Sequence, residues 1–255
     1  MGQIGDCGAR MKLTDFKLLS FDCYGTLIDW ETGLRAALAP LMARAGVAPD
    51  RALADFAREE SAQEAETPAM RYADILVRVH ARLARAWGAS STAAENTAFG
   101  LSIPDWPAFR DSAAALAGLK EHFQLVILSN VDRASFAGSN RRLGVTFDAV
   151  HTAEDIGSYK PDPRNFRYLL DRCAERGIRR DQILHVAQSL YHDHGPANDA
   201  GITSCWIDRR AGRPGGATKT PAAAPRYQWR FESMGALLNA VRAERPAGQG
   251  ATPPG

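Results

Sequence analysis

Short apolar runs alternate with longer helical patterns over most of the chain. Repeated strand–helix units of this kind predict an α/β fold, in which helices cover both faces of a parallel sheet. The expected strands lie near residues 17–22, 124–130, 149–152, 181–189, 202–209 and 227–231.

The alternation is interrupted between the first two expected strands. Residues 33–46, 50–66 and 70–88 are Ala-rich or periodic in the way that helices are, with no strand between them. We therefore expect an inserted helical cap over 32–108, and a core formed by 1–31 and 109–244. Residues 245–255 are rich in Gly, Pro and Ala, which predicts a disordered tail.

The composition excludes several classes of protein. The 255 residues carry 31 basic and 29 acidic side chains, a formal net charge of +2, which gives no electrostatic footprint for nucleic acid. No apolar run approaches the roughly 18 residues that a membrane span needs, so no membrane partner is expected. The N-terminus has no secretory pattern and the 4 cysteines have no metal or redox spacing, which favours a cytoplasmic protein with reduced thiols.

Polar residues follow the apolar strands in chain order. Because the carboxyl ends of parallel strands meet at one edge of a sheet, these side chains are expected to converge. Each type alone is more often a turn, loop or surface residue. Together, a carboxylate, a lysine that keeps it ionised and several small hydrogen-bond donors suit nucleophilic catalysis. The set is Asp22, Thr26, Ser129, Asn130, Lys160, Ser189 and Asp193.

Four segments that carry these residues resemble the successive motifs of the haloacid dehalogenase-like hydrolase superfamily. They read FDCYGTLIDW, LSNVD, SYKPDP and HVAQSLYHDHGPANDAG. Within the superfamily the chain is most similar to the type II 2-haloacid dehalogenases. The resemblance implies a Rossmann-like core with a helical cap inserted after the first strand. It also leaves a homodimer open, since dimers are common in the family.

The resemblance implies a role for each matched residue. Asp22 takes the place of the nucleophile, Thr26 that of the hydroxyl that orients it, and Lys160 that of the lysine of the third motif. Asp193 matches the acid that positions this lysine or the hydrolytic water. Ser129 and Asn130 match the pair that binds the anionic group of the substrate or its leaving group, and Ser189 stands where the family has an asparagine.

Two departures bear on the reaction. Phosphatases of the superfamily have a second acid two residues after the nucleophile, where this chain has Tyr24. A halide leaves as a stable anion and needs no such acid. Gln188 replaces a further acid, and Mg²⁺ prefers several carboxylate oxygens. We therefore expect a reaction without metal or cofactor. A magnesium-dependent phosphatase acting on a small phosphorylated metabolite is the alternative.

The pocket itself departs from the dehalogenase pattern. Phe166 stands where those enzymes have a tyrosine, and the fourth motif has one extra residue before Asp193. His192 and His194 flank this acid, where each is either a base for water or a partner of nearby backbone.

The cap is expected to supply a cation for the substrate carboxylate. The resemblance places an arginine in the early cap helices, for which Arg58 is the first choice and Arg71 the second. Trp30 and Tyr72 are candidates for apolar walls around the reacting carbon. The sequence thus predicts a metal-independent hydrolase of short 2-haloalkanoic acids that forms an ester on Asp22.

Overall fold

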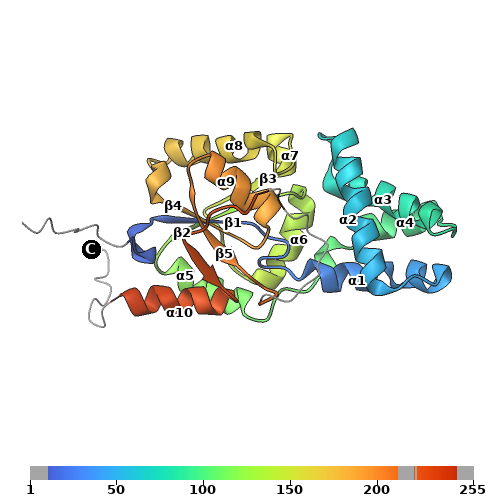
Figure 1. Cartoon of the computed structure of the whole chain (residues 1–255), viewed down its shortest axis with the longest axis horizontal. Coiled ribbons are helices and arrows are strands. Elements are labelled where there is room, and N and C mark those ends of the chain that lie inside the picture. The colour runs from blue at the N-terminus through green and yellow to red at the C-terminus, as the bar shows by residue number, and fades with distance from the viewer. Residues whose placement is uncertain (1–10, 212–220, 222, 246–255) are drawn as a thin grey trace, which may run out of the picture.

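A parallel sheet is the centre of the molecule. The computed structural model describes residues 11–211, 221 and 223–245. Within these residues the sheet has the strand order β3-β2-β1-β4-β5-β6, and every neighbouring pair is parallel (Figure 1). This order is the Rossmann order, so the predicted fold class is confirmed. The strands are β1 (Leu18–Phe21), β2 (Gln124–Ser129), β3 (Ala149–Thr152), β4 (Ile183–Ala187), β5 (Thr203–Ile207) and β6 (Trp229–Phe231).

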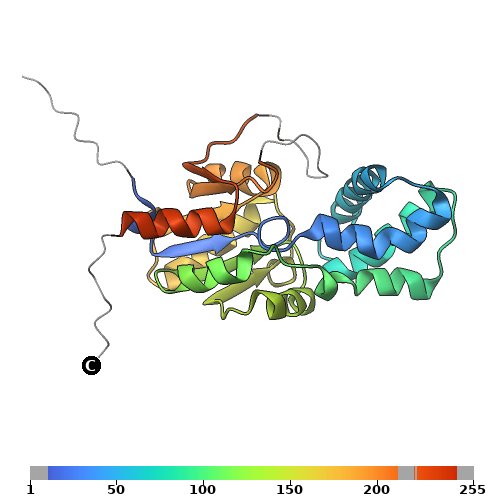
Figure 2. The ribbon, with the colours of Figure 1, turned by 90° about the horizontal axis from the view of Figure 1, so that it is seen from below.

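Side chains alternate between the two faces of the sheet, and each face has its own helices. Leu19 and Phe21 of β1 belong to a core shared with α5 (Ser112–Lys120), α6 (Arg133–Leu143) and α10 (Met234–Glu244). Leu18 points to the other face and packs with α8 (Pro163–Glu175) and α9 (Gly195–Asp199). The short α7 (Ala153–Ile156) follows β3. Figures 1 and 2 show the two helical layers on opposite sides of the strands.

Four of the helices between β1 and β2 project from one end of the sheet (Figures 1 and 2). They are α1 (Trp30–Ala45), α2 (Pro49–Glu66), α3 (Tyr72–Ala86) and α4 (Ala93–Gly100). Local signals set their ends: the Asp29 carboxylate caps α1 by accepting a hydrogen bond from the Thr32 backbone at 3.2 Å, and Gly46 ends the helix with a φ of 64°. Inside this group the Phe56 ring packs against Trp30 on one side and against Phe99 on another.

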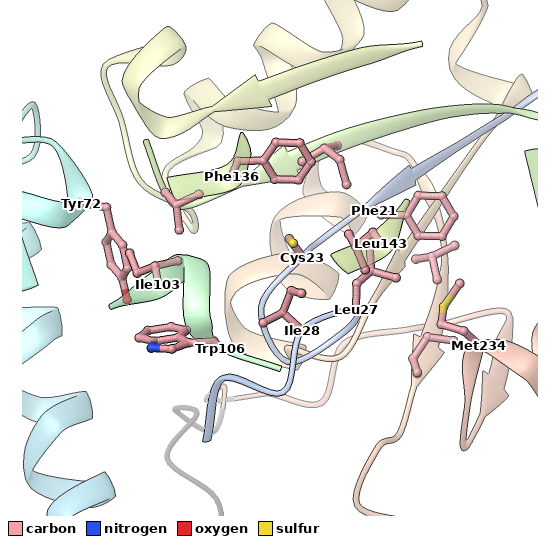
Figure 3. Close-up of a cluster of buried hydrophobic side chains, with 14 of the residues drawn as sticks. Phe21, Cys23, Leu27, Ile28, Tyr72, Ile103, Trp106, Phe136, Leu143 and Met234 are labelled. Atoms are coloured by element: carbon pink, nitrogen blue, oxygen red, sulfur yellow. The ribbon is translucent and has the colours of Figure 1, made fainter. Parts of the chain in front are cut away.

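Two segments of the chain connect these helices to the sheet region. The Asp29 N–H donates to the Pro107 carbonyl at 2.8 Å, and the Phe109 N–H donates to the Leu27 carbonyl at 3.0 Å. Figure 3 shows buried side chains running from Phe21 to Trp106 and Tyr72 across this connection. The cap helices therefore rest on the sheet edge through continuous apolar packing.

Three further expectations concern the domain boundaries, the C-terminal tail and membrane spans. The division into a core of 1–31 and 109–244 and a cap of 32–108 stays a prediction. The predicted disordered tail, 245–255, lies outside the described residues except for Arg245. In the part of the chain that the structure describes, no helix is long and apolar enough to cross a membrane.

Candidate active site

The site lies where the strand order of the sheet reverses. From β1 the chain continues to β2 and β3 on one side, and it later returns to β4 on the other side. Asp22 directly follows β1, and Asp193 lies in a turn of π-helix, Leu190–His194, just after the adjacent β4. Such a switch point opens a crevice at the carboxyl ends of the strands, which is where ligands bind in open α/β sheets.

Lys160 joins these two acids. Its Nζ donates to Asp22 Oδ1 at 3.0 Å, to Asp193 Oδ1 at 2.6 Å and to the Leu128 carbonyl at 2.9 Å. Only 1% of the Lys160 side chain is exposed, so the ammonium group has three protein partners and little water. Burial acts to lower the pKa of Lys160, but the charges of Asp193 and Asp22 raise it above its usual value.

The two carboxylates respond to this environment in opposite ways. Burial raises the pKa of Asp22, while Lys160 opposes the rise and the charge of Asp193 adds to it. Burial also acts against the ionised form of Asp193. There Lys160, together with a hydrogen bond to His185, holds the pKa well below its usual range. Asp193 is therefore the carboxylate whose ionised form is more stabilised, and Asp22 is the less stabilised carboxylate of the pair.

Thr26 fixes the orientation of Asp22. Its Oγ1 donates to Asp22 Oδ2 at 2.6 Å and accepts from the Gln188 backbone N–H at 2.9 Å. The Arg209 guanidinium in turn donates to the Thr26 carbonyl from Nε and Nη2, at 3.0 and 2.8 Å. The turn after β1 is thus tied to the loop after β4, and the hydroxyl has the place that the sequence predicts for it.

Asn130 holds the segment that carries Lys160. Its Nδ2 donates to the Lys160 carbonyl at 3.0 Å, and its Oδ1 accepts from the Lys160 N–H at 2.7 Å. Both ends of the Asn130 amide are therefore engaged with protein, although the residue lines the cavity described below. The Ser129 hydroxyl is buried without a hydrogen-bond partner among the described residues. Substrate binding by either residue stays a proposal.

His185, on β4, is in hydrogen-bond contact with Asp193. This buried side chain lies opposite Ser20 in the β1–β4 register, with Nδ1 at 2.8 Å from Ser20 Oγ and Nε2 at 3.0 Å from Asp193 Oδ1. Asp193 Oδ1 therefore has two partners, whereas its buried Oδ2 has no partner among the described residues. Asp193 also lines the cavity described below, so a carboxylate with one unpartnered oxygen belongs to the site.

The two histidines beside Asp193 have different surroundings. His194 is buried, with Nδ1 at 2.8 Å from Ser204 Oγ and Nε2 at 3.0 Å from the Ala187 carbonyl, and burial lowers its pKa to about 4. His192 instead lines the cavity, together with Ser189, whose Oγ accepts from the His192 N–H at 3.0 Å. The structure thus places His194 among structural contacts and His192 at the site.

A cavity of about 100 Å³ lies above Asp22. This volume exceeds the roughly 10–15 Å³ that a cavity needs to hold a single water, which suits a small ligand. Tyr24, Trp30, Tyr72 and Trp106 contribute aromatic walls. The Tyr24 hydroxyl is in hydrogen-bond contact with Ser139 Oγ at 2.8 Å, so this side chain is held by α6. Phe166 is not among the lining residues and packs on His185 in the other core.

The cap does not present the arginine that the sequence predicts. Arg58 has a side chain that is 59% exposed and pairs with Asp55 at 2.7 Å and Glu59 at 3.2 Å. The cavity face of α2 carries Ala57, Glu60, Ser61 and Glu64, which recur with helical spacing. Because one residue turns the helix by about 100°, Arg58 points away from this face. Arg71 is equally exposed and pairs with Asp74.

The donor set does not fit a magnesium ion. The Lys160 ammonium lies between Asp22 and Asp193 and takes one oxygen of each, while Thr26 takes the second oxygen of Asp22. A divalent cation at this position would face the positive charge of Lys160. Among the described residues no cluster of three or more His, Cys, Asp or Glu side chains is arranged to hold a metal.

Comparison with known proteins agrees with this geometry. The model of the haloacid dehalogenase-like hydrolases matches residues 16–201, a range that contains Asp22, Lys160 and Asp193. The chain belongs to this family. It is therefore an enzyme, a hydrolase with the fold that the sequence predicts.

Individual relatives share less of the sequence. Two curated proteins are 30% identical: the haloacid dehalogenase-like hydrolase domain-containing protein 3 of Danio rerio over 116 residues, and an (S)-2-haloacid dehalogenase of Pseudomonas putida over 107 residues. These matches cover 43% and 41% of the hydrolase, and 45% of each relative, so they span less than half of the relatives' length.

A solved structure shows the fold over a longer range. The L-2-haloacid dehalogenase of Xanthobacter autotrophicus with covalently bound chloropropionic acid has a TM-score of 0.74 at 18% identity. The alignment covers 90% of the hydrolase and 100% of that chain.

Three polar residues at the site were not predicted from the sequence. His185 interrupts an otherwise apolar strand, and a polar residue in a buried strand is a signal that could have identified it. Glu60 and Glu64 follow Ala57 at helical spacing, so they share its face of α2. Finding them required knowledge of which face of α2 covers the site.

Proposed function

We propose that this hydrolase breaks a carbon–halogen bond in a short 2-haloalkanoic acid or a derivative with the same carbon skeleton. An oxygen of Asp22 attacks the carbon that bears the halogen, the new C–O bond forms, and the halide leaves with the electron pair. The observation that carries this proposal is the carboxylate of Asp22, oriented by Thr26 and held beside Lys160 under a small cavity.

The second step returns the enzyme to its first state. Water attacks Cγ of the Asp22 ester, the bond from Cγ to the substrate oxygen breaks, and the alcohol product leaves. The unpartnered Oδ2 of Asp193 is placed to accept a hydrogen bond from this water, and His192 lines the same cavity as a proton acceptor. Overall, one organohalide and one water give one alcohol, one halide ion and one proton.

Lys160 makes a metal unnecessary in this scheme. Its ammonium keeps Asp22 beside a positive charge during attack and holds Asp193 ionised for the second step. Tyr24 has no acid to offer a leaving group, and a halide needs none. The aromatic cap residues exclude bulk water from the reacting carboxylate.

Isotope labelling tests the ester directly. Turnover of 2-chloropropionate and 2-chloropropionamide in H₂¹⁸O is expected to place ¹⁸O in the Asp22 carboxylate, read by mass spectrometry of the peptide, since water attacks Cγ. Asp22→Asn is expected to lower halide release by about ten-thousandfold. Asp171→Asn, an exposed acid on α8, is the control and retains activity.

Two results would contradict the proposal. If Asp22 stayed unlabelled while halide was released, water would attack the substrate directly. If phosphate esters were hydrolysed and EDTA abolished the activity, the magnesium-dependent phosphatase would be the correct function.

A further inference from the structure

His185 and Ser20 form a polar pair inside the apolar sheet. The strand β4 is buried along its whole length, and His185 is its one polar residue. The neighbouring strand β1 places Ser20 beside it in the parallel register, with Ser20 Oγ at 2.8 Å from His185 Nδ1. The Phe166 ring packs against His185 with centroids 5.0 Å apart. Burial of polar side chains costs free energy unless they are hydrogen-bonded, so this pair indicates a role beyond packing.

Asp193 is the second partner of His185. The His185 Nε2 lies 3.0 Å from Asp193 Oδ1, and the same oxygen accepts from Lys160 Nζ at 2.6 Å. Burial acts against the ionised form of Asp193, but Lys160 and the hydrogen bond with His185 hold its pKa well below its usual range. Because an ionised carboxylate only accepts hydrogen bonds, His185 Nε2 carries a proton and donates it to this contact.

Ser20 selects this orientation of the ring. When Nε2 carries the single ring proton, Nδ1 is an acceptor, and the Ser20 hydroxyl fills it as a donor. Hydrogen bonds then run from Ser20 through His185 to Asp193. Two donors on Oδ1 oppose rotation of the Asp193 carboxylate, whereas Lys160 alone could pair with either oxygen. The contacts thus keep Oδ2 as the oxygen without a partner among the described residues.

Two other buried histidines show what packing alone looks like in this chain. His194 has contacts with the Ser204 hydroxyl and the Ala187 carbonyl. His80, inside the cap, has Nδ1 at 2.7 Å from Asn96 Oδ1 and a phenylalanine ring at 5.0 Å. Of these three described side chains, His185 is the one in hydrogen-bond contact with an acid of the site.

We infer that His185 is a positioning residue for the second step of the reaction. Together with Lys160 it fixes Asp193 so that Oδ2 receives the water that attacks the Asp22 ester. Water forms a bond to Cγ, the bond from Cγ to the substrate oxygen breaks, one proton of the water ends on the alcohol, and the other is released. The inference rests on the proposed dehalogenation and assigns to His185 the step after halide release.

His185→Leu separates the two steps. Halide release is expected to show a burst equal to the enzyme concentration, followed by a steady rate about ten- to a hundredfold below wild type, since a hydrogen bond to a charged group is worth this factor. Because kcat/KM reports the steps up to halide release, it is expected to stay unchanged while kcat and KM fall together. Rapid quenching with 2-chloropropionate, followed by mass spectrometry, is expected to find the ester on the Asp22 peptide.

Matched variants distinguish positioning from packing. His185→Gln keeps an N–H donor that reaches Asp193, and it is expected to restore most of kcat and to remove the burst. His80→Leu is the control, because it removes a buried histidine with a similar polar partner and a similar aromatic neighbour. Both leucine variants are expected to lower the melting temperature, but only His185→Leu is expected to accumulate the ester.

The route through Asp193 is tested by a double variant. Asp193→Asn is expected to slow hydrolysis of the Asp22 ester, measured in a single turnover. Adding His185→Leu is expected to slow it no further, because residues that act through one another are not additive. A further fall as large as that caused by His185→Leu alone would show that His185 acts by another route and would overturn the inference.

The position of the ring proton gives a readout that needs no turnover. Long-range ¹H–¹⁵N spectra of the wild-type protein are expected to show the His185 proton on Nε2, and Asp193→Asn is expected to change this signal. If no halide were released, the proposed function would fail, whereas the Nε2 proton would still show that His185 orients Asp193. A neutral ring with its proton on Nδ1, or ester hydrolysis at the wild-type rate in His185→Leu, would refute the inference.

Discussion

Lys160 is buried between two carboxylates, and this position makes it the residue on which the site most depends. Its charge offsets the burial of Asp22 and Asp193 at once, with contacts of 3.0 and 2.6 Å. Removing one partner from a buried ion pair leaves an uncompensated charge and costs about 3 to 5 kcal/mol. The arrangement therefore links the stability of the sheet edge to the chemistry of the site.

Lys160→Met is expected to lower the free energy of unfolding by about 3 to 5 kcal/mol at neutral pH. In the wild type, Lys160 depresses the pKa of Asp193, so this stabilisation is present above the unfolded value of 3.8 and is lost as pH falls below it. In the variant, burial raises the pKa of both acids, and acidification neutralises them. The melting temperature of the variant is therefore expected to lie closer to that of the wild type at pH 5 than at pH 8.

Thermal unfolding followed by circular dichroism at both pH values measures this difference. Lys120→Met is the control, since Lys120 is partly exposed and pairs with Asp148 at the protein surface. A Lys160→Met protein as stable as wild type at pH 8 would contradict the assigned role of the buried charge.

At this scale, sequence predicts the residues that chemistry makes distinctive. Asp22, Thr26, Lys160 and Asp193 stand at strand ends in a recognisable order, and the structure brings them into contact. The position of Arg58 could not be predicted in this way, because a helix carries its side chains in all directions. A shift of one residue along the helix decides whether a side chain faces the cavity or solvent.

The π-helix Leu190–His194 is the element that places Asp193. The resemblance to the dehalogenase motif implies one extra residue before this acid, and the chain forms here a π-helix, whose backbone hydrogen bonds join residues five apart. The His194 N–H lies 3.3 Å from the Ser189 carbonyl, and the Gly195 N–H bonds to the Leu190 carbonyl, each five residues apart. Single-turn π-bulges of this kind often occur at functional sites.

Deletion of Tyr191 is expected to convert this turn to an ordinary α-helix. Because Asp193 would then rotate by about 100°, it would lose its contacts with Lys160 and His185. We expect kcat for halide release to fall by at least about a hundredfold, with helix content by circular dichroism preserved. Tyr191→Ala keeps the chain length and is the control. Full activity in the deletion variant would show that the extra residue has no positioning role.

Most elements could be predicted from periodicity, but their exact nature could not. Helices expected at 50–66 and 70–88 occur as α2 and α3, because their periodic apolar residues mark them. The prediction missed α4, whose apolar pattern is short, although Thr92 and Glu95 form a capping box. The π-helix has no sequence pattern of its own. Its position goes with the contacts of Asp193 to Lys160 and His185, which a local pattern does not reveal.

In the whole molecule, polar as well as apolar contacts join the cap helices to the sheet edge. One polar contact across this junction is built on Asp132, which is 3% exposed. Its Oδ1 accepts from the Ser135 N–H at 2.9 Å and caps α6, while its Oδ2 accepts from the Ala73 N–H at 3.0 Å, in the first turn of α3. A single carboxylate thus begins two helices, one beside the sheet and one in the cap.

Asp132→Ala is expected to loosen the cap as well as destabilise α6. Loss of an N-cap costs roughly 0.5 to 2 kcal/mol, and here the first turn of α3 loses its acceptor too. Hydrogen exchange at residues 72–76 is expected to accelerate while the central strands keep their protection, and KM is expected to rise because Tyr72 helps to line the cavity. Asp155→Ala removes a comparable cap from α7, where Asp155 accepts from the Thr152 N–H at 2.9 Å, without touching the cap helices. If both variants left exchange in α3 unchanged, apolar packing alone would hold the cap in place, and Asp132 would serve α6 only.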